Sequence, residues 1–87
     1  MAADNVVSIT GSRPSQLGEP RQGLIEAIED ILAMAKSGRL QSFIGTGFTA
    51  DGNRLACWGG HHENVYEMLG AINWLEHEYV SRQTNEA

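Results

Sequence analysis

Residues Ser42–Glu63 read SFIGTGFTADGNRLACWGGHHE, and this stretch decides the fold. Asp51-Gly52 stands between two runs of alternating residues, which is a strong β-hairpin signal because a primed two-residue turn needs positive φ at both central positions. The runs on either side are therefore predicted to be paired antiparallel strands. Residues 59–62, GGHH, then lead from the second strand into a helix.

A two-residue loop determines the expected register of this hairpin. It places Phe48 opposite Leu55 and Thr46 opposite Cys57, and it groups these side chains on the face that is expected to meet the helices. The residues predicted on that inner face are Ile44, Thr46, Phe48, Leu55 and Cys57.

The opposite face of the hairpin is predicted to carry an aromatic ring over glycines. In the two-residue register Trp58 lies against Gly45 and Gly47, where the missing side chains leave room for the ring. A three-residue loop over residues 51–53 is the alternative, and it would exchange the faces of one strand.

Helical periodicity predicts one helix before the hairpin and one after it. The first begins near Pro20 and stops at Gly38, since a glycine can adopt the left-handed conformation that ends a helix. The second runs to about Arg82, and both helices are expected to cover one face of the sheet. The predicted inner stripes are Leu24, Ile25, Ile28, Ile31, Leu32 and Ala35 on the first helix, and Val65, Met68, Leu69, Ile72, Leu75 and Tyr79 on the second.

The two ends of the chain lack a regular pattern. Residues 1–19 are predicted to be a flexible arm, residues 20–82 a single domain, and residues 83–87 a C-terminal tail. Val6, Val7 and Ile9 form a β-prone island within the arm. The alternative for this island is a strand that adds to the hairpin edge of its own or a neighbouring subunit.

Composition limits the classes of function. The 87 residues carry a net charge of −5, which argues against a protein that binds the nucleic-acid backbone. The single cysteine, Cys57, has no disulfide partner in the chain, which fits a reducing compartment. No signal peptide or membrane-spanning run is visible, so we expect a cytoplasmic protein without a membrane partner.

The expected fold class is α+β, a helix–hairpin–helix (αββα) protomer. A two-stranded sheet is barely stable alone. The second helix has apolar residues on more than one side, and Gly70 interrupts it near Trp74. We therefore expect homo-oligomerisation, as a dimer or larger, to complete the sheet and the second helix, with Gly70 and Trp74 in the interface.

The exit from the second strand has the components of a small anion site. Glycines precede the free amides of a helix N-terminus, an aromatic ring offers a stacking surface, and histidines and an arginine can donate hydrogen bonds to a phosphate. A nucleotide-like ligand is the expected occupant. The candidate ligand-binding residues are Arg54, Trp58, Gly59, Gly60, His61 and His62.

Metal binding and catalysis are less favoured by the sequence. His61, His62 and Glu63 are adjacent, with Cys57 nearby, but no second ligand pair at zinc spacing completes four ligands. A histidine could act as a general base, yet no serine lies in a nucleophile elbow and Cys57 is predicted to be buried. We therefore expect a protein that is not an enzyme and that binds no cofactor or metal.

Three segments together resemble small uncharacterised proteins encoded by bacteriophages and prophages of proteobacteria. They are LIEAIEDILAMAKSGRLQSF, TADGNRLACWGG and EMLGAINWLEHEYV, which lie between Leu24 and Val80. The shared features are an acidic first helix with a Gly-Arg-Leu turn, an Asp-Gly hairpin, a Trp-x-Gly-type exit and Leu-Gly-Ala in the last helix. The resemblance implies a host-defence antagonist, either an oligomeric sponge for nucleotide signals or an inhibitor of a defence protein.

Three interpretations of function remain open at this point. The first is a non-enzymatic phage-type binding protein that sequesters a small nucleotide-like ligand. The second is a protein-interaction module that masks a host protein through Trp58, Trp74 and its acidic surface. In the third, Trp58 and Trp74 only fill an oligomer interface.

Overall fold

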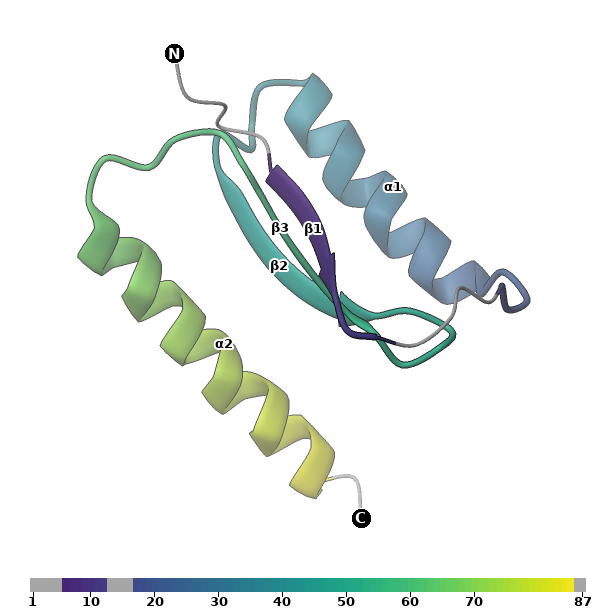
Figure 1. Ribbon diagram of the computed structural model, residues 1–87. Coiled ribbons are helices and arrows are strands. Elements are labelled where there is room, and N and C mark those ends of the chain that lie inside the picture. Colours follow the sequence, from purple (N-terminus) through teal and green to yellow (C-terminus); the bar gives the residue numbers. More distant parts are fainter. Residues whose placement is uncertain (1–5, 13–16, 86–87) are drawn as a thin grey trace.

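The computed structural model describes residues 6–12 and 17–85 (Figure 1). Parts of the expected arm (residues 1–19) and of the expected tail (residues 83–87) lie outside the described residues, namely residues 1–5, 13–16 and 86–87. The elements in chain order are β1 (Val6–Thr10), α1 (Gln22–Lys36), β2 (Phe43–Phe48), β3 (Arg54–Gly59) and α2 (Val65–Asn85). The expected α+β class is confirmed, with two helices and an antiparallel hairpin.

The sheet has three strands in the order β1-β3-β2, where a hairpin alone would supply two. β1 pairs antiparallel with β3, so that Val7 lies opposite Cys57 and Ile9 opposite Leu55. The β-prone island of the N-terminal region therefore forms an edge strand, which was the alternative to a loose arm. β3 becomes the central strand and has a hydrogen-bonded neighbour on each side.

The hairpin loop contains three residues, Ala50–Gly52, and not two. The Thr49 amide donates to the Asn53 carbonyl oxygen at 2.8 Å, and the Gly52 amide donates to the Thr49 carbonyl oxygen at 3.0 Å. Gly52 has φ of 87°, so the loop is a tight turn followed by a left-handed glycine bulge. Both the two-residue loop and the alternative loop over residues 51–53 are wrong.

The three-residue loop shifts the register of the whole hairpin by one position. The expected pairs Phe48–Leu55 and Thr46–Cys57 are wrong, and their members lie on opposite faces of the sheet. The observed pairs are Phe43–Gly59, Ile44–Trp58, Gly45–Cys57, Thr46–Ala56, Gly47–Leu55 and Phe48–Arg54.

The same shift moves the indole away from the strand glycines. Trp58 lies opposite Ile44, on the other face from Gly45 and Gly47, so the expected contact of the ring with these glycines is wrong. A side chain built at residue 45 would instead meet the Phe43 ring at 3.1 Å and the Cys57 sulfur at 3.7 Å. The missing side chain at Gly45 therefore makes room for the Phe43 ring, on the face that carries Cys57.

Helix α1 ends as predicted. Gly38 has φ of 86°, its amide donates to the Ala35 carbonyl oxygen at 3.1 Å, and the Arg39 amide donates to the Met34 carbonyl oxygen at 3.0 Å. These two bonds make a Schellman motif, which satisfies carbonyls that the end of a helix leaves free. The turn directs the chain from the end of α1 towards β2.

The sheet lies between the two helices, with α1 and α2 on opposite sides of it (Figure 1). The expectation that both helices cover one face is therefore wrong. α2 is also longer than expected, because the helix continues past Arg82 to Asn85.

Neither helix encloses a hydrophobic core with the sheet. Among residues 6–12 and 17–85, no hydrophobic side chain is buried. Parts of the apolar stripes are half-buried, as at Ile25 and Ile31 of α1 and Met68 and Ile72 of α2. The stripe residues that remain exposed are Leu24, Ile28, Leu32 and Ala35 on α1, and Val65, Leu69, Leu75 and Tyr79 on α2.

The chain as a whole is open for its size. Its accessible surface is 7694 Å², whereas a compact monomer of 9.5 kDa exposes about 5,000 Å². Its radius of gyration is 14.9 Å, against about 12 Å for a compact domain of this length. The secondary structure is thus formed while much of the apolar surface stays uncovered.

Candidate functional site

A sharp turn carries the chain from β3 towards α2. Gly60 follows the strand and has φ of 75°, a backbone conformation that residues with a Cβ rarely adopt. A Cβ at this position would also lie 2.2 Å from the Gln41 carbonyl oxygen. Gly60 is therefore required for local structure, because the backbone before β2 passes directly against it.

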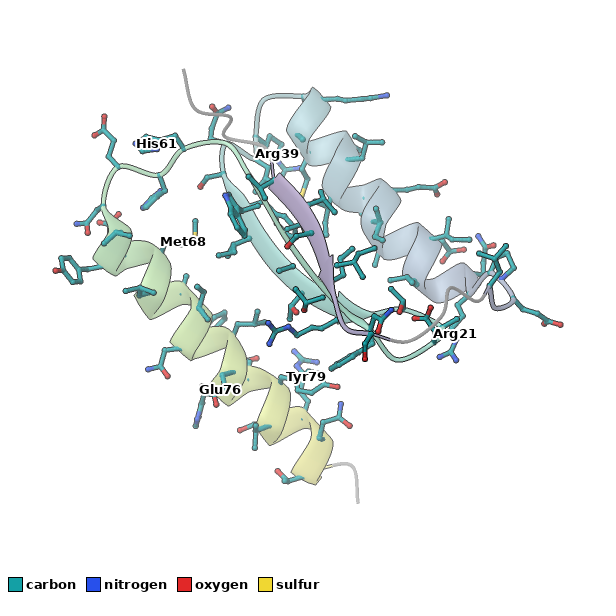
Figure 2. The ribbon with its side chains drawn as sticks, viewed as in Figure 1. Arg21, Arg39, His61, Met68, Glu76 and Tyr79 are labelled. Atoms are coloured by element: carbon teal, nitrogen blue, oxygen red, sulfur yellow. The ribbon has the colours of Figure 1, made fainter. Side chains whose placement is uncertain are left out.

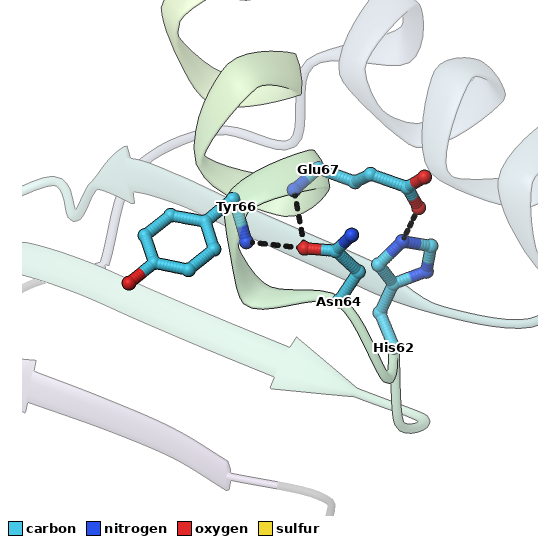
Figure 3. A network of polar contacts seen from close by, with 4 residues as sticks. All are labelled: His62, Asn64, Tyr66 and Glu67. Atoms are coloured by element: carbon cyan, nitrogen blue, oxygen red, sulfur yellow. Dashed lines mark hydrogen bonds and ion pairs between the residues drawn. The ribbon is translucent and has the colours of Figure 1, made fainter.

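Asn64 caps the N-terminus of α2. Its Oδ1 accepts hydrogen bonds from the Tyr66 amide at 2.9 Å and from the Glu67 amide at 3.3 Å (Figure 3). The Asn64 carbonyl oxygen accepts a further bond from the Met68 amide at 3.3 Å. An asparagine in this position is a strong helix N-cap. The amides that were expected to bind an anion thus already have a partner within the chain.

His62 is held by an acidic side chain. Its Nε2 lies 2.8 Å from Oε1 of Glu67, in the first turn of α2 (Figure 3). A carboxylate in the first turn of a helix interacts favourably with the helix dipole, but it repels a second anion. The geometry therefore disfavours a phosphate directly at the start of α2.

The concave part of this region lies beside the Trp58 ring. An open hollow of about 330 Å³ lies where the start of β2 and the end of β3, opposite the hairpin loop, face the start of α2. Its lining residues are Ser42, Phe43, Ile44, Trp58, Gly59, Gly60, His62, Val65 and Met68. Met68 lies on the sheet-facing side of α2 (Figure 2). The lining is mostly apolar, which suits a flat ring better than a charged group.

Four of the six predicted ligand-binding residues line this hollow, and two do not. Trp58, Gly59, Gly60 and His62 are brought together there. Arg54 lies on the same face of β3 but four residues before Trp58, or about 13 Å along the strand.

His61 is exposed and does not line the hollow, although it is adjacent to His62 in sequence. One small ligand therefore cannot use the complete predicted set.

Metal ligands do not gather in the part of the chain that the structure describes, where no group of three His, Cys, Asp or Glu residues is placed to hold an ion. Cys57 is a half-buried free thiol, lying between Val7 and Gly45 on its two neighbouring strands. Within residues 6–12 and 17–85, neither helix is both long and apolar enough to cross a membrane.

The predicted interface residues Gly70 and Trp74 lie one turn apart on α2. In the part of the chain that the structure describes, no atom outside the nearby helix backbone comes within 4 Å of the position that a Cβ on Gly70 would occupy, and the Trp74 side chain is 65% exposed. The structure also exposes parts of both apolar stripes, which periodicity assigned to the inside. Periodicity identifies an apolar face, but it cannot say whether the same chain or another chain covers it.

Comparison with known proteins adds no further assignment. No protein-family model matches this sequence, and comparison with curated proteins and with solved structures found no similar protein. The resemblance to phage proteins therefore stays a prediction.

Proposed function

We propose that this chain is a non-enzymatic interaction protein that associates with further copies of itself and acts through protein–protein contacts. The observation that carries this proposal is the uncovered apolar surface. Both helices and the sheet are formed, yet none of the described hydrophobic side chains is buried. Exposed apolar surface of this extent is typical of an interface between proteins.

The amount of surface supports an oligomer in particular. The chain exposes roughly 2,600 Å² more than a compact monomer of its mass. A stable protein–protein interface buries about 800 Å² on each partner. The excess is therefore large enough for an extensive interface, as in obligate homodimers, or for more than one contact.

Both helices contribute to this surface. On α1, Leu24, Ile28 and Leu32 are each at least half exposed, and on α2 the same holds for Leu69 and Leu75. Full burial of one large aliphatic side chain contributes about 1.5–3 kcal/mol. Association that covers these residues would supply the stabilisation that the open protomer lacks.

The first test is the mass in solution. Size-exclusion chromatography with multi-angle light scattering at micromolar concentration should give at least twice the protomer mass of 9.5 kDa. A single species of protomer mass that melts cooperatively would contradict the proposal. If the oligomer forms, the surface that it leaves exposed is where a host protein of the kind implied by the phage resemblance would bind.

A second candidate function is supported by the hollow beside Trp58. Its volume of about 330 Å³ is at the lower end of small-molecule sites, and the rings of Phe43 and Trp58 form part of its wall. A nucleotide whose base stacks on Trp58 is the ligand that we propose for it. The capped helix N-terminus and the His62–Glu67 contact leave no prepared phosphate site there, so this candidate ranks second.

A further inference from the structure

One side of α2 carries aromatic residues and a glycine at one-turn spacing. Tyr66, Gly70 and Trp74 are each four residues apart and so lie on one face of the helix. Met68 and Tyr79 lie on the opposite side, which faces the sheet (Figure 2). Within residues 6–12 and 17–85, the outer face thus has no intramolecular surface to pack against.

The outer face combines a projecting ring with an open gap. Tyr66 is 80% exposed and Trp74 is 65% exposed. No described residue lies within 4 Å of a Cβ built on Gly70, apart from the chain neighbours and the backbone of its own helix. A glycine weakens a helix relative to alanine, and a large exposed indole gains nothing within the protomer. Both features are explained if a second surface lies against them.

We propose that two copies of this chain pair through antiparallel α2 helices, with Trp74 of each copy packed over Gly70 of the other. This inference rests on the proposed function, because it identifies one contact of the proposed oligomer. Under two-fold symmetry, a contact from residue 70 to residue 74 of the partner is repeated in reverse. One ring and one gap, four residues apart, therefore make a self-complementary surface.

The charges on α2 favour the antiparallel arrangement over a parallel one. With Gly70 opposite Trp74, the antiparallel register places Glu67 opposite His77 and Glu78 opposite Tyr66. A parallel pair would place each of these carboxylates against its own copy, and like charges in direct opposition are destabilising. It would also place ring against ring and leave both glycine gaps empty.

The size of the uncovered surface makes a second copy a sufficient occupant. The chain exposes roughly 2,600 Å² beyond a compact monomer, and a standard interface needs about 800 Å² from each partner. An unrelated partner would not need the ring and the gap to be matched on the same helix. A second copy does need this match, since the same face must serve both sides.

Two substitutions test the contact, alone and as a mixture. Gly70→Leu fills the gap, and Trp74→Ala removes the ring. Each should raise the dissociation constant of this contact by about 30-fold or more in sedimentation velocity, as expected for a central interface residue. An equimolar mixture should recover association as a heterodimer. One contact in it is native, and in the other the introduced leucine meets the introduced alanine.

A matched control separates the contact from a general effect of leucine on a helix. Gly23 lies in α1 and, like Gly70, has none of the described residues packed within 4 Å of a built Cβ. Gly23→Leu should leave the mass unchanged. Circular dichroism of each variant checks that the helices are formed, and recovery in the mixture itself requires both variants to be folded.

The outcomes distinguish this inference from the proposed function. A monomeric wild-type protein would contradict the proposed function and this contact together. An oligomeric wild type whose mass is unaffected by Gly70→Leu and Trp74→Ala would overturn the contact alone. A mixture that associates no better than the separate variants, while both stay helical, would also overturn it.

Discussion

Trp58 occupies the position where the sheet ends and the chain turns towards α2. Its cross-strand neighbours are Val6 and Ile44, and Gly60 follows two residues later with positive φ. The side chain is 43% exposed, with part of the ring in the wall of the hollow. A tryptophan in this setting is available both to a ligand and to a packing partner.

The first prediction, at the scale of single residues, concerns the ligand proposed for this hollow. Trp58→Ala should weaken nucleotide binding by about 1–3 kcal/mol, since it removes a stacking surface. Arg54→Ala is the matched control and should leave the affinity unchanged. The Arg54 backbone lies about 13 Å along β3 from Trp58, and its side chain does not line the hollow.

Calorimetry against a panel of linear and cyclic nucleotides measures both effects. No heat with any member of the panel would remove the second candidate function. An equal loss of affinity in Arg54→Ala would show that the ligand lies along β3 and not in the hollow.

Local signals on single residues explain most of what could be predicted about the candidate site. Residues 58–62 are consecutive, so their proximity follows from the chain itself, and four of the six predicted residues line one hollow. Arg54 shares a face with Trp58, but a shared face does not bring two residues together, and four residues of extended strand separate them by about 13 Å. The capping role of Asn64 could have been predicted, because asparagine before a helical run is a start signal.

At the scale of elements, the two helices and the hairpin could be predicted because their signals are local. Apolar spacing and Gly38 are read within a few residues, and both describe backbone geometry directly. The register could not be predicted in this way. Asp51-Gly52 fits the centre of a two-residue turn and also the end of a three-residue loop with a glycine bulge.

Polar side chains in and beside the loop make contacts within the three-residue turn. Thr49 Oγ1 contacts the Asp51 carboxylate and accepts a hydrogen bond from the Asn53 amide at 3.0 Å. These bonds accompany the three-residue loop in the structure. Turn composition alone therefore leaves the register open by one residue.

The next prediction concerns the contribution of the edge strand β1 to the free energy of unfolding. Removal of residues 1–11 deletes β1 and leaves one edge of β3 unpaired. The truncated protein should lose on the order of 1–3 kcal/mol of unfolding free energy, from the cross-strand pairs that are removed. Urea denaturation at matched protein concentration measures this loss. Removal of residues 1–5 alone is the control, and equal stability of both truncations would contradict a structural role for β1.

At the scale of the whole molecule, the open protomer is the property that periodicity could not reveal. The stripes on α1 and α2 were predicted correctly as apolar, but Leu24 and Leu75 remain 59% and 58% exposed. A hollow of about 400 Å³ also separates the middle of α1 from the sheet around Phe43 and Gly59. In the part of the chain that the structure describes, the two helices and three strands bury no hydrophobic side chain.

The central claim is that association with further copies completes this fold. An obligate oligomer is stabilised by mass action, so its melting temperature depends on protein concentration. We expect the melting temperature to rise by about 5–10 °C when the concentration is raised a hundredfold. The measurement is thermal unfolding followed by circular dichroism at both concentrations. A cooperative transition at the same temperature in both samples would contradict the account, because a fold completed within one chain melts independently of concentration.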